Sequence, residues 1–134
     1  MSGEIRKVNL VGINKEGIKA DPNFPNRIFF PLKLSTYPDS RWVAFFRDEY
    51  EKYGCSKKGF LREQRHDEIV LDIGEDDDFQ THCNNVKEVI EATNKAVERE
   101  NVKIAAEDKK REEENQRRKE KLDRLKEKAD KVKL

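Results

Sequence analysis

The chain has 134 residues, of which 43% are charged and 34% apolar, and its formal net charge at pH 7 is +1. This length favours one domain, and the charge lacks the basic excess that is typical of dedicated nucleic-acid-binding proteins. No apolar run approaches the roughly 18 residues that a membrane span needs, and the N-terminus lacks a signal-peptide core. We therefore expect a soluble, cytoplasmic protein that makes no contact with a membrane.

Two short strands joined by a turn are expected near the N-terminus. Apolar residues between positions 8 and 13 predict a strand, and residues 18–20 predict a second strand that returns antiparallel. Between them, Asn14 and Gly17 take the first and fourth positions of a turn, where glycine accepts a left-handed backbone at little cost. Two prolines in residues 21–26 then predict a loop.

Residues 27–35 form the clearest strand pattern in the chain. Apolar side chains alternate onto one face, and the opposite face carries Arg27, Phe29, Pro31 and Lys33. Because proline cannot donate to a hydrogen-bond ladder, Pro31 predicts that this strand lies at a sheet edge or carries a bulge.

A helix is expected next, with Asp39 or Ser40 as its cap and Gly54 at its end. Its buried face is predicted from a helical spacing that selects Trp42, Phe45, Phe46, Glu49 and Tyr53.

Two further strands and a long helix complete the expected fold. Residues 60–65 and 68–73 read as strands, and the second is apolar enough at its centre to lie in the middle of the sheet. A helix then begins near Asp77 and meets no glycine or proline before the end of the chain. We predict an α+β fold: a small antiparallel sheet with two helices, in which the long C-terminal helix extends beyond the head. The expected domains are a head, residues 1–104, and a charged helical C-terminal extension, residues 105–134.

The C-terminal extension has almost nothing to bury. Residues 107–121 contain no apolar side chain, yet they are mostly strong helix formers. A short apolar seam follows, with the 3-4-3 spacing of a coiled coil, at Leu122, Leu125, Ala129 and Val132. Six opposite-charge pairs at i,i+4 spacing, such as Lys109–Glu113 and Glu127–Lys131, could instead support a lone helix, and the composition also permits disorder.

An acidic cluster surrounds the start of the C-terminal helix. Carboxylates at Asp72, Asp76 and Asp78 could hold Mg²⁺ or Ca²⁺, which would suit a metal-dependent enzyme. The competing interpretation is that these residues cap the helix and complement the positive end of its dipole.

The cysteine and histidine residues give only weak support for a zinc site or a catalytic thiol. Cys55, His66, His82 and Cys83 lack the paired spacing of a zinc site. We expect Cys83 to be buried on the apolar helix face beside an exposed His82, and Cys55 to be an ordinary loop thiol. No catalytic residue is assigned, and no cofactor is expected.

Three functions remain open from the sequence. The first is a non-enzymatic protein–protein interaction or assembly module that associates, with itself or an unknown protein, through the C-terminal helix or a sheet edge, with Leu122, Leu125, Ala129 and Val132 as contacts. The second is single-stranded nucleic-acid binding through the basic and aromatic strand face of Arg27, Phe29 and Lys33. The third is the metal-dependent enzyme built on the acidic cluster.

Overall fold

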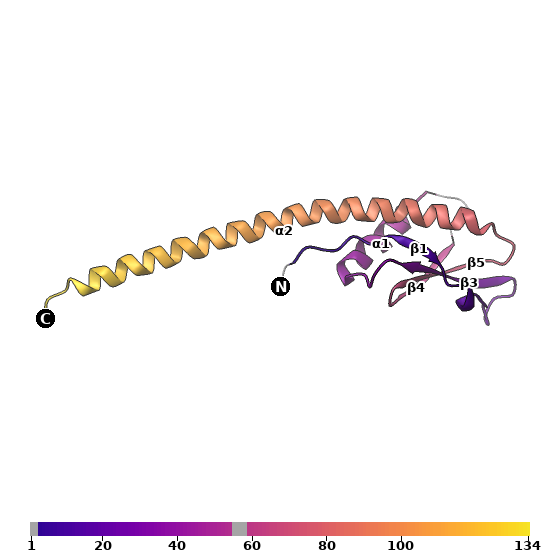
Figure 1. The fold of residues 1–134 in the computed structure, drawn as a ribbon, viewed down its shortest axis with the longest axis horizontal. Coiled ribbons are helices and arrows are strands. Elements are labelled where there is room, and N and C mark those ends of the chain that lie inside the picture. Colours follow the sequence, from indigo (N-terminus) through magenta and orange to yellow (C-terminus); the bar gives the residue numbers. More distant parts are fainter. Residues whose placement is uncertain (1–2, 55–58) are drawn as a thin grey trace. The chain divides into compact units, whose positions relative to one another are not determined.

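The structure, a computed structural model, describes residues 3–54 and 59–134 and has the expected α+β fold (Figure 1). It contains a five-stranded antiparallel sheet and two α-helices, α1 and α2. The elements in chain order are β1 (Leu10–Ile13), the 3-10 helix η1 (Lys15–Gly17), β2 (Lys19–Ala20), β3 (Arg27–Leu34), α1 (Ser40–Lys52), β4 (Phe60–Arg65), β5 (Glu68–Gly74) and α2 (Phe79–Asp130).

The strands lie in the order β1-β3-β5-β4, and β2 also pairs with β3. The predicted central position of residues 68–73 is confirmed, because β5 lies between β3 and β4. The predicted edge position or bulge of residues 27–35 is wrong. β3 is an inner strand with an unbroken register against β5, and the bulges occur in β1 at Val11 and in β4 at Arg62.

Pro31 is tolerated in an inner strand because of where its nitrogen points. Its carbonyl oxygen accepts a hydrogen bond from the amide of Asn14 at 3.1 Å, on the side of β3 that faces β1 and β2. In a strand, the nitrogen and carbonyl of one residue point to the same side, so the missing donor of Pro31 faces the gap that η1 leaves between β1 and β2. Pro31 therefore removes no bond from the ladder with β5.

Gly17 is needed in η1 for space and not for a left-handed backbone. None of the glycines in the described residues has a positive φ. A Cβ atom on Gly17 would lie 2.8 Å from Cγ of Pro31 and 2.9 Å from Nδ2 of Asn14. The prediction that Gly17 adopts a left-handed backbone is therefore wrong. Glycine is needed here because a side chain would collide with Pro31.

Helix α1 begins at the predicted cap and buries a slightly different stripe. The carboxylate of Asp39 accepts a hydrogen bond from the amide of Arg41 at 2.8 Å, as an N-cap does. The buried residues are Trp42, Phe46 and Tyr50, which repeat every four positions. Phe45 and Tyr53 are only half-buried, so the stripe runs at a steeper angle around the helix than predicted.

One face of the sheet packs against α1 and the first part of α2. Phe30 of β3 contacts Phe79 of α2 with ring centroids 4.6 Å apart, and the rings of Trp42 and Phe46 stack within this layer at 5.3 Å. The largest fully buried side chains are Trp42, Phe30, Phe46, Leu32, Ile69, Leu71, Ile73, Val8, Val86, Val89, Val97 and Thr93. This apolar core is the main source of stability for the fold.

Asn94 of α2 links three parts of this core. Its side-chain oxygen accepts hydrogen bonds from the indole N–H of Trp42 at 2.9 Å and from the amide of Val8 at 3.2 Å. Its amide group donates to the carbonyl of Val8 at 2.8 Å. The segment before β1 thus pairs with an α2 side chain, as it would with a neighbouring strand.

The chain divides into two compact units. The larger comprises Ile5–Arg99 and contains the whole sheet, α1 and the first part of α2. The other comprises Glu100–Leu134 with the first residues of the chain. The predicted boundary after residue 104 lies five residues beyond this division.

The described residues include no helix that combines the length and apolar character required to cross a membrane.

Candidate interaction surfaces

The face of the sheet opposite the helices carries polar and aromatic side chains from three strands. Phe29 of β3 lies opposite Asp72 of β5, which in turn lies opposite Phe60 of β4. Lys33 lies opposite Glu68 further along the same two inner strands. We call this surface the open face: Arg27, Phe29, Lys33, Phe60, Arg62 and Asp72, together with Asp21 and Phe24 from the loop before β3.

Arg27 is held at the centre of one end of the open face. Its Nε donates to Oδ1 of Asp72 at 2.7 Å, and its terminal nitrogen donates to the backbone carbonyl of Asp72 at 2.7 Å. Its guanidinium carbon also lies 5.3 Å from the ring centroid of Phe60, a cation–π distance. Arg27 is therefore held in place by Asp72 and Phe60.

Asp72 and Asp21 form a nearly buried pair of carboxyl groups beside Arg27. Asp21 is 6% exposed and Asp72 is 7% exposed. Burial and a hydrogen bond with Asp21 raise the pKa of Asp72, although Arg27 opposes this shift. The same hydrogen bond from Asp72, followed by a bond from the amide of Asn23, lowers the pKa of Asp21. Asp72 is consequently the carboxyl group of this pair that takes up a proton more easily.

A second cation–π contact lies next to this pair. The guanidinium of Arg62 stands 4.3 Å from the ring centroid of Phe29. Two other rings on the open face remain exposed, Phe24 at 60% and Phe60 at 72%. Together with Arg27, Arg62 and Asp72 they line a pocket of about 460 Å³.

The structure brings two of the three predicted nucleic-acid-binding residues into one cluster. Arg27 bonds to Asp72, and Phe29 lies opposite Asp72 on the neighbouring strand. Lys33 is exposed and lies opposite Glu68, near the other end of β3. The sequence interpretation missed Phe60 and Arg62. The alternation of residues 60–62 would have placed these two side chains on one face, had their strand been paired with β5.

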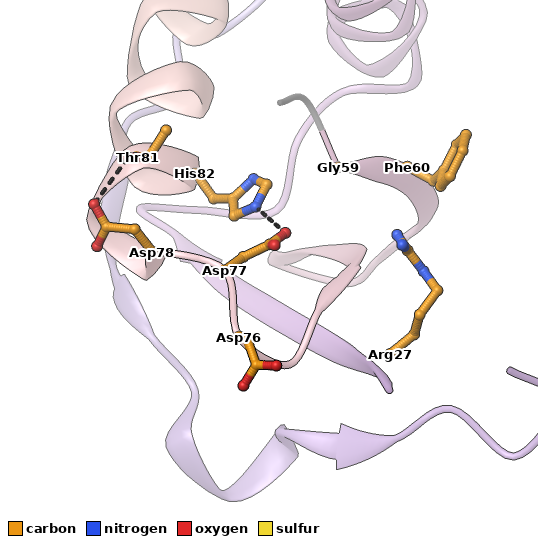
Figure 2. A pocket seen from close by; sticks show the side chains of 8 residues that line it. All are labelled: Arg27, Gly59, Phe60, Asp76, Asp77, Asp78, Thr81 and His82. Carbon is orange, nitrogen blue, oxygen red and sulfur yellow. Dashed lines mark hydrogen bonds and ion pairs between the residues drawn. The ribbon is translucent and has the colours of Figure 1, made fainter. Parts of the chain in front are cut away.

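A second pocket, of about 450 Å³, lies at the start of α2 (Figure 2). Asp77 and His82 face each other across one side of it, and Arg27 and Phe60 stand on the other. Asp78 caps the helix: its carboxylate accepts hydrogen bonds from the amide of Gln80 at 3.2 Å and from the hydroxyl of Thr81 at 2.9 Å. The helix-capping interpretation of the acidic cluster therefore holds for Asp78.

His82 is the buried member of this pocket. It is 2% exposed, and its Nε2 lies 2.8 Å from Oδ2 of Asp77. Its Nδ1 has no hydrogen-bond partner within the described parts of the chain. The bond from His82, together with the amide of Gly74, lowers the pKa of Asp77.

The three predicted metal-binding carboxylates are occupied in different ways. Asp72 bonds to Arg27, Asp78 caps α2, and Asp76 is exposed and points away from His82 (Figure 2). Among the described residues, no three His, Cys, Asp or Glu side chains are grouped so that they could hold a metal ion.

The predicted relation between His82 and Cys83 is wrong. His82 is buried, while Cys83 is half-buried and its pKa is raised by burial, which disfavours the thiolate. His66 lies in the turn between β4 and β5, where its Nδ1 is 3.1 Å from the hydroxyl of Tyr37. Cys55 lies outside the described residues.

The C-terminal extension is helical as far as Asp130 and exposed on all sides from Lys109 onward. The predicted seam residues include Leu122, which is 56% exposed, Leu125 at 51% and Val132 at 63%. The charged groups of the six predicted i,i+4 pairs do not come within 4 Å of each other among the described residues 105–134. Asp108 and Arg111, three residues apart, do so at 3.7 Å. Exposed ion pairs contribute little to stability, so the side chains of the C-terminal extension do little to stabilise its helix.

Comparisons of this chain with models of protein families, with curated proteins and with solved structures give no match.

Proposed function

We propose that this protein is an assembly module that associates with a second copy of itself through the C-terminal extension. The observation that carries the proposal is the exposure of Leu122 and Leu125, each more than half accessible, on a helix that has no other side chain to cover them within residues 109–134. A helix of this kind gains stability when a second helix covers its apolar seam.

The edges of the sheet are less suited to association than the helix. β4 forms one edge and carries a bulge at Arg62. The other edge is formed by β1, which carries a bulge at Val11, and by β2, which has only two residues. Bulges twist an edge strand and interrupt its row of free hydrogen-bonding groups, which discourages pairing with another sheet. We therefore place the assembly surface on α2.

The test is the mass of the full chain in solution, measured by light scattering over a range of concentrations. We expect the mass to rise from 15.8 kDa towards twice that value as concentration increases. The double variant Leu122→Gln with Leu125→Gln should stay at the mass of one chain, because glutamine keeps helix propensity but removes the apolar seam.

A matched control uses the same helix turn and the same new residue. Asp123→Gln with Arg124→Gln changes two residues on the opposite side of the helix and leaves the net charge unchanged. This variant should associate like the wild-type chain. A wild-type chain that remains at 15.8 kDa at high concentration would rule out self-association.

A second candidate function is single-stranded nucleic-acid binding at the open face. It is favoured by the exposed rings of Phe24 and Phe60 beside the guanidinium groups of Arg27 and Arg62, since such rings stack with bases. Mixed-sequence oligonucleotides at low salt should then bind the wild-type chain, and Phe60→Ala should weaken binding while Tyr37→Ala, at an exposed ring elsewhere, should not. Absence of binding at low salt would remove this candidate.

A further inference from the structure

The residues that flank the seam change sign halfway along the C-terminal extension. Stepping back from the seam by seven residues at a time continues it through Asn115 and Arg118 to Asp108 and Arg111. The positions beside it are exposed; they are acidic in the first half, at Glu107, Glu112 and Glu114, and basic in the second half, at Lys119, Lys121, Lys126 and Lys128. The two halves thus offer opposite charges to a neighbouring helix.

The net charge of the C-terminal extension also changes sign, from negative in its first half to positive in its second half. Residues 105–116 contain three Lys or Arg and five Asp or Glu, a net charge of −2, and residues 117–134 contain nine and four, a net charge of +5. Charges on the flanks of a helix pair decide which direction the second helix takes, because like charges in contact repel.

A parallel pair would place like charges together. Each residue would lie at the height of its own copy, so Arg111 and Arg118 would stack on themselves along the seam. On the flanks, Glu107 would lie beside Glu112 of the second copy and Lys121 beside Lys126, which leaves Glu114 beside Lys119 as the opposite-charge pair between them. The pairing of Leu122 and Leu125 with their own copies would be the main attraction, and it covers only one end of the segment.

An antiparallel pair removes these conflicts. When two copies are centred between Gln116 and Arg117, the acidic half of each lies along the basic half of the other. Three complementary flank pairs result, each formed twice by symmetry: Glu107 with Lys128, Glu112 with Lys119, and Glu114 with Lys121. Along the seam Leu122 meets the apolar stem of Arg111, and Ile104 meets Ala129, so no like charges face each other there.

We infer that two copies of this chain pair antiparallel through residues 104–129 of α2, with the acidic half of each extension against the basic half of the other. This inference rests on the proposed self-association. It adds that the two α2 helices enter the paired segment from opposite ends. Because the flank pairs are exposed to solvent, the dimer should dissociate more readily as salt concentration rises.

Distances between spin labels test the orientation in the full chain. Cys55 and Cys83 are replaced by serine, and one label is attached at Arg117→Cys or at Glu127→Cys, both on the outer side of the helix. Antiparallel pairing places the two Arg117 labels at nearly the same height, whereas the two Glu127 labels are separated along the axis by about 30 Å, from about 21 residues at 1.5 Å each.

The outcomes separate the inference from the function on which it rests. A short distance at 117 with a long one at 127 is the expected result. Short distances at both positions would show a parallel dimer, which overturns the inference and leaves self-association intact. Absence of a dipolar signal at both positions, with the mass of one chain, would overturn self-association and the inference together.

A charge-reversal experiment tests the flank pairs separately. Glu107→Lys, Glu112→Lys and Glu114→Lys together replace every attractive flank pair by a repulsive one and should weaken the dimer at least tenfold. The control, Glu113→Lys with Glu120→Lys and Glu127→Lys, makes the same change in net charge on the outer side of the helix. Equal weakening by both variants would show that net charge alone governs association, which contradicts the role given to the flanks.

Discussion

Asp72 and Asp21 are two neighbouring carboxyl groups in a nearly buried site, where two negative charges would repel each other. Nε of Arg27, 2.7 Å from Oδ1 of Asp72, compensates part of this charge, and the raised pKa of Asp72 eases its protonation, which removes more of it. The pair connects the loop before β3 to the inner strand β5. Its protonation therefore affects how firmly that loop is held.

We expect the Asp72 carboxyl to make the fold less stable as pH rises. Its pKa is raised in the folded state, so its contribution to stability is complete below the ordinary carboxyl pKa of about 4 and is lost as pH passes through the raised value. Asp72→Asn keeps a donor towards Asp21 and an acceptor for Arg27 but does not ionise. Its stability relative to the wild type should therefore increase with pH, by an amount on the order of 1 kcal/mol.

Denaturant unfolding of both proteins at several values between pH 4 and pH 8 gives this difference. Asp76→Asn serves as the control, because Asp76 is an exposed carboxyl two residues beyond the end of β5. A difference between wild type and Asp72→Asn that stays constant over this range would contradict the raised pKa of Asp72.

Asp77 should affect stability with the opposite dependence on pH. Its pKa is lowered, mainly by the hydrogen bond with His82, so its contribution is present above the ordinary carboxyl pKa and disappears as pH falls through the lowered value. Asp77→Asn should reduce the free energy of unfolding at pH 7 by roughly 0.5–1.5 kcal/mol, the usual value of one hydrogen bond. The reduction should shrink at pH 3, as thermal or urea unfolding at the two pH values would show. An equal loss at both values would mean that the ionised form of Asp77 is not the partner of His82.

The strand alternation and the helix capping could be read from the sequence because they depend on near neighbours. Residues 27–34 alternate between the core and the open face as predicted, and Asp39 caps α1. The position of Pro31 could not be read in the same way. It depends on the gap between β1 and β2, which forms only when the N-terminal segment folds back onto β3.

The buried polar residues were missed for a related reason. His82 lies on the same helix face as Val86, Val89 and Thr93, at spacings that predict burial, but histidine is usually classed as polar and was placed in solvent. Asp21 gave no signal of its own, since it lies in a loop and its neighbour Asp72 lies on β5, far along the chain. His82 has its carboxyl partner, Asp77, only five residues away, whereas Asp72 comes close to Asp21 only once the sheet has formed.

Asn94 should be among the most sensitive surface-accessible positions of α2. Asn94→Ala would leave the indole N–H of Trp42 and both backbone groups of Val8 without their partner, and unpaired buried polar groups cost about 1–3 kcal/mol each. We expect a loss of about 2–4 kcal/mol in the free energy of unfolding. Asn84→Ala on the same helix should cost much less, because Asn84 is exposed and bonds to Gln80 one turn away. Comparable losses for the two variants would show that Asn94 does not hold the segment before β1.

Gly17 and Gly12 provide a comparison between two glycines whose backbones are ordinary but whose surroundings differ. A Cβ at position 17 would lie 2.8 Å from the ring of Pro31, which has little freedom to move because it sits in an inner strand, whereas a Cβ at position 12 meets nothing within 4 Å. Gly17→Ala should therefore destabilise the fold by about 1–3 kcal/mol through overpacking. Gly12→Ala should be neutral or stabilise it by up to about 1 kcal/mol, because alanine has less freedom to lose on folding. Thermal unfolding of the two variants checks both signs, and a stable Gly17→Ala protein would mean that η1 can move away from Pro31 at no cost.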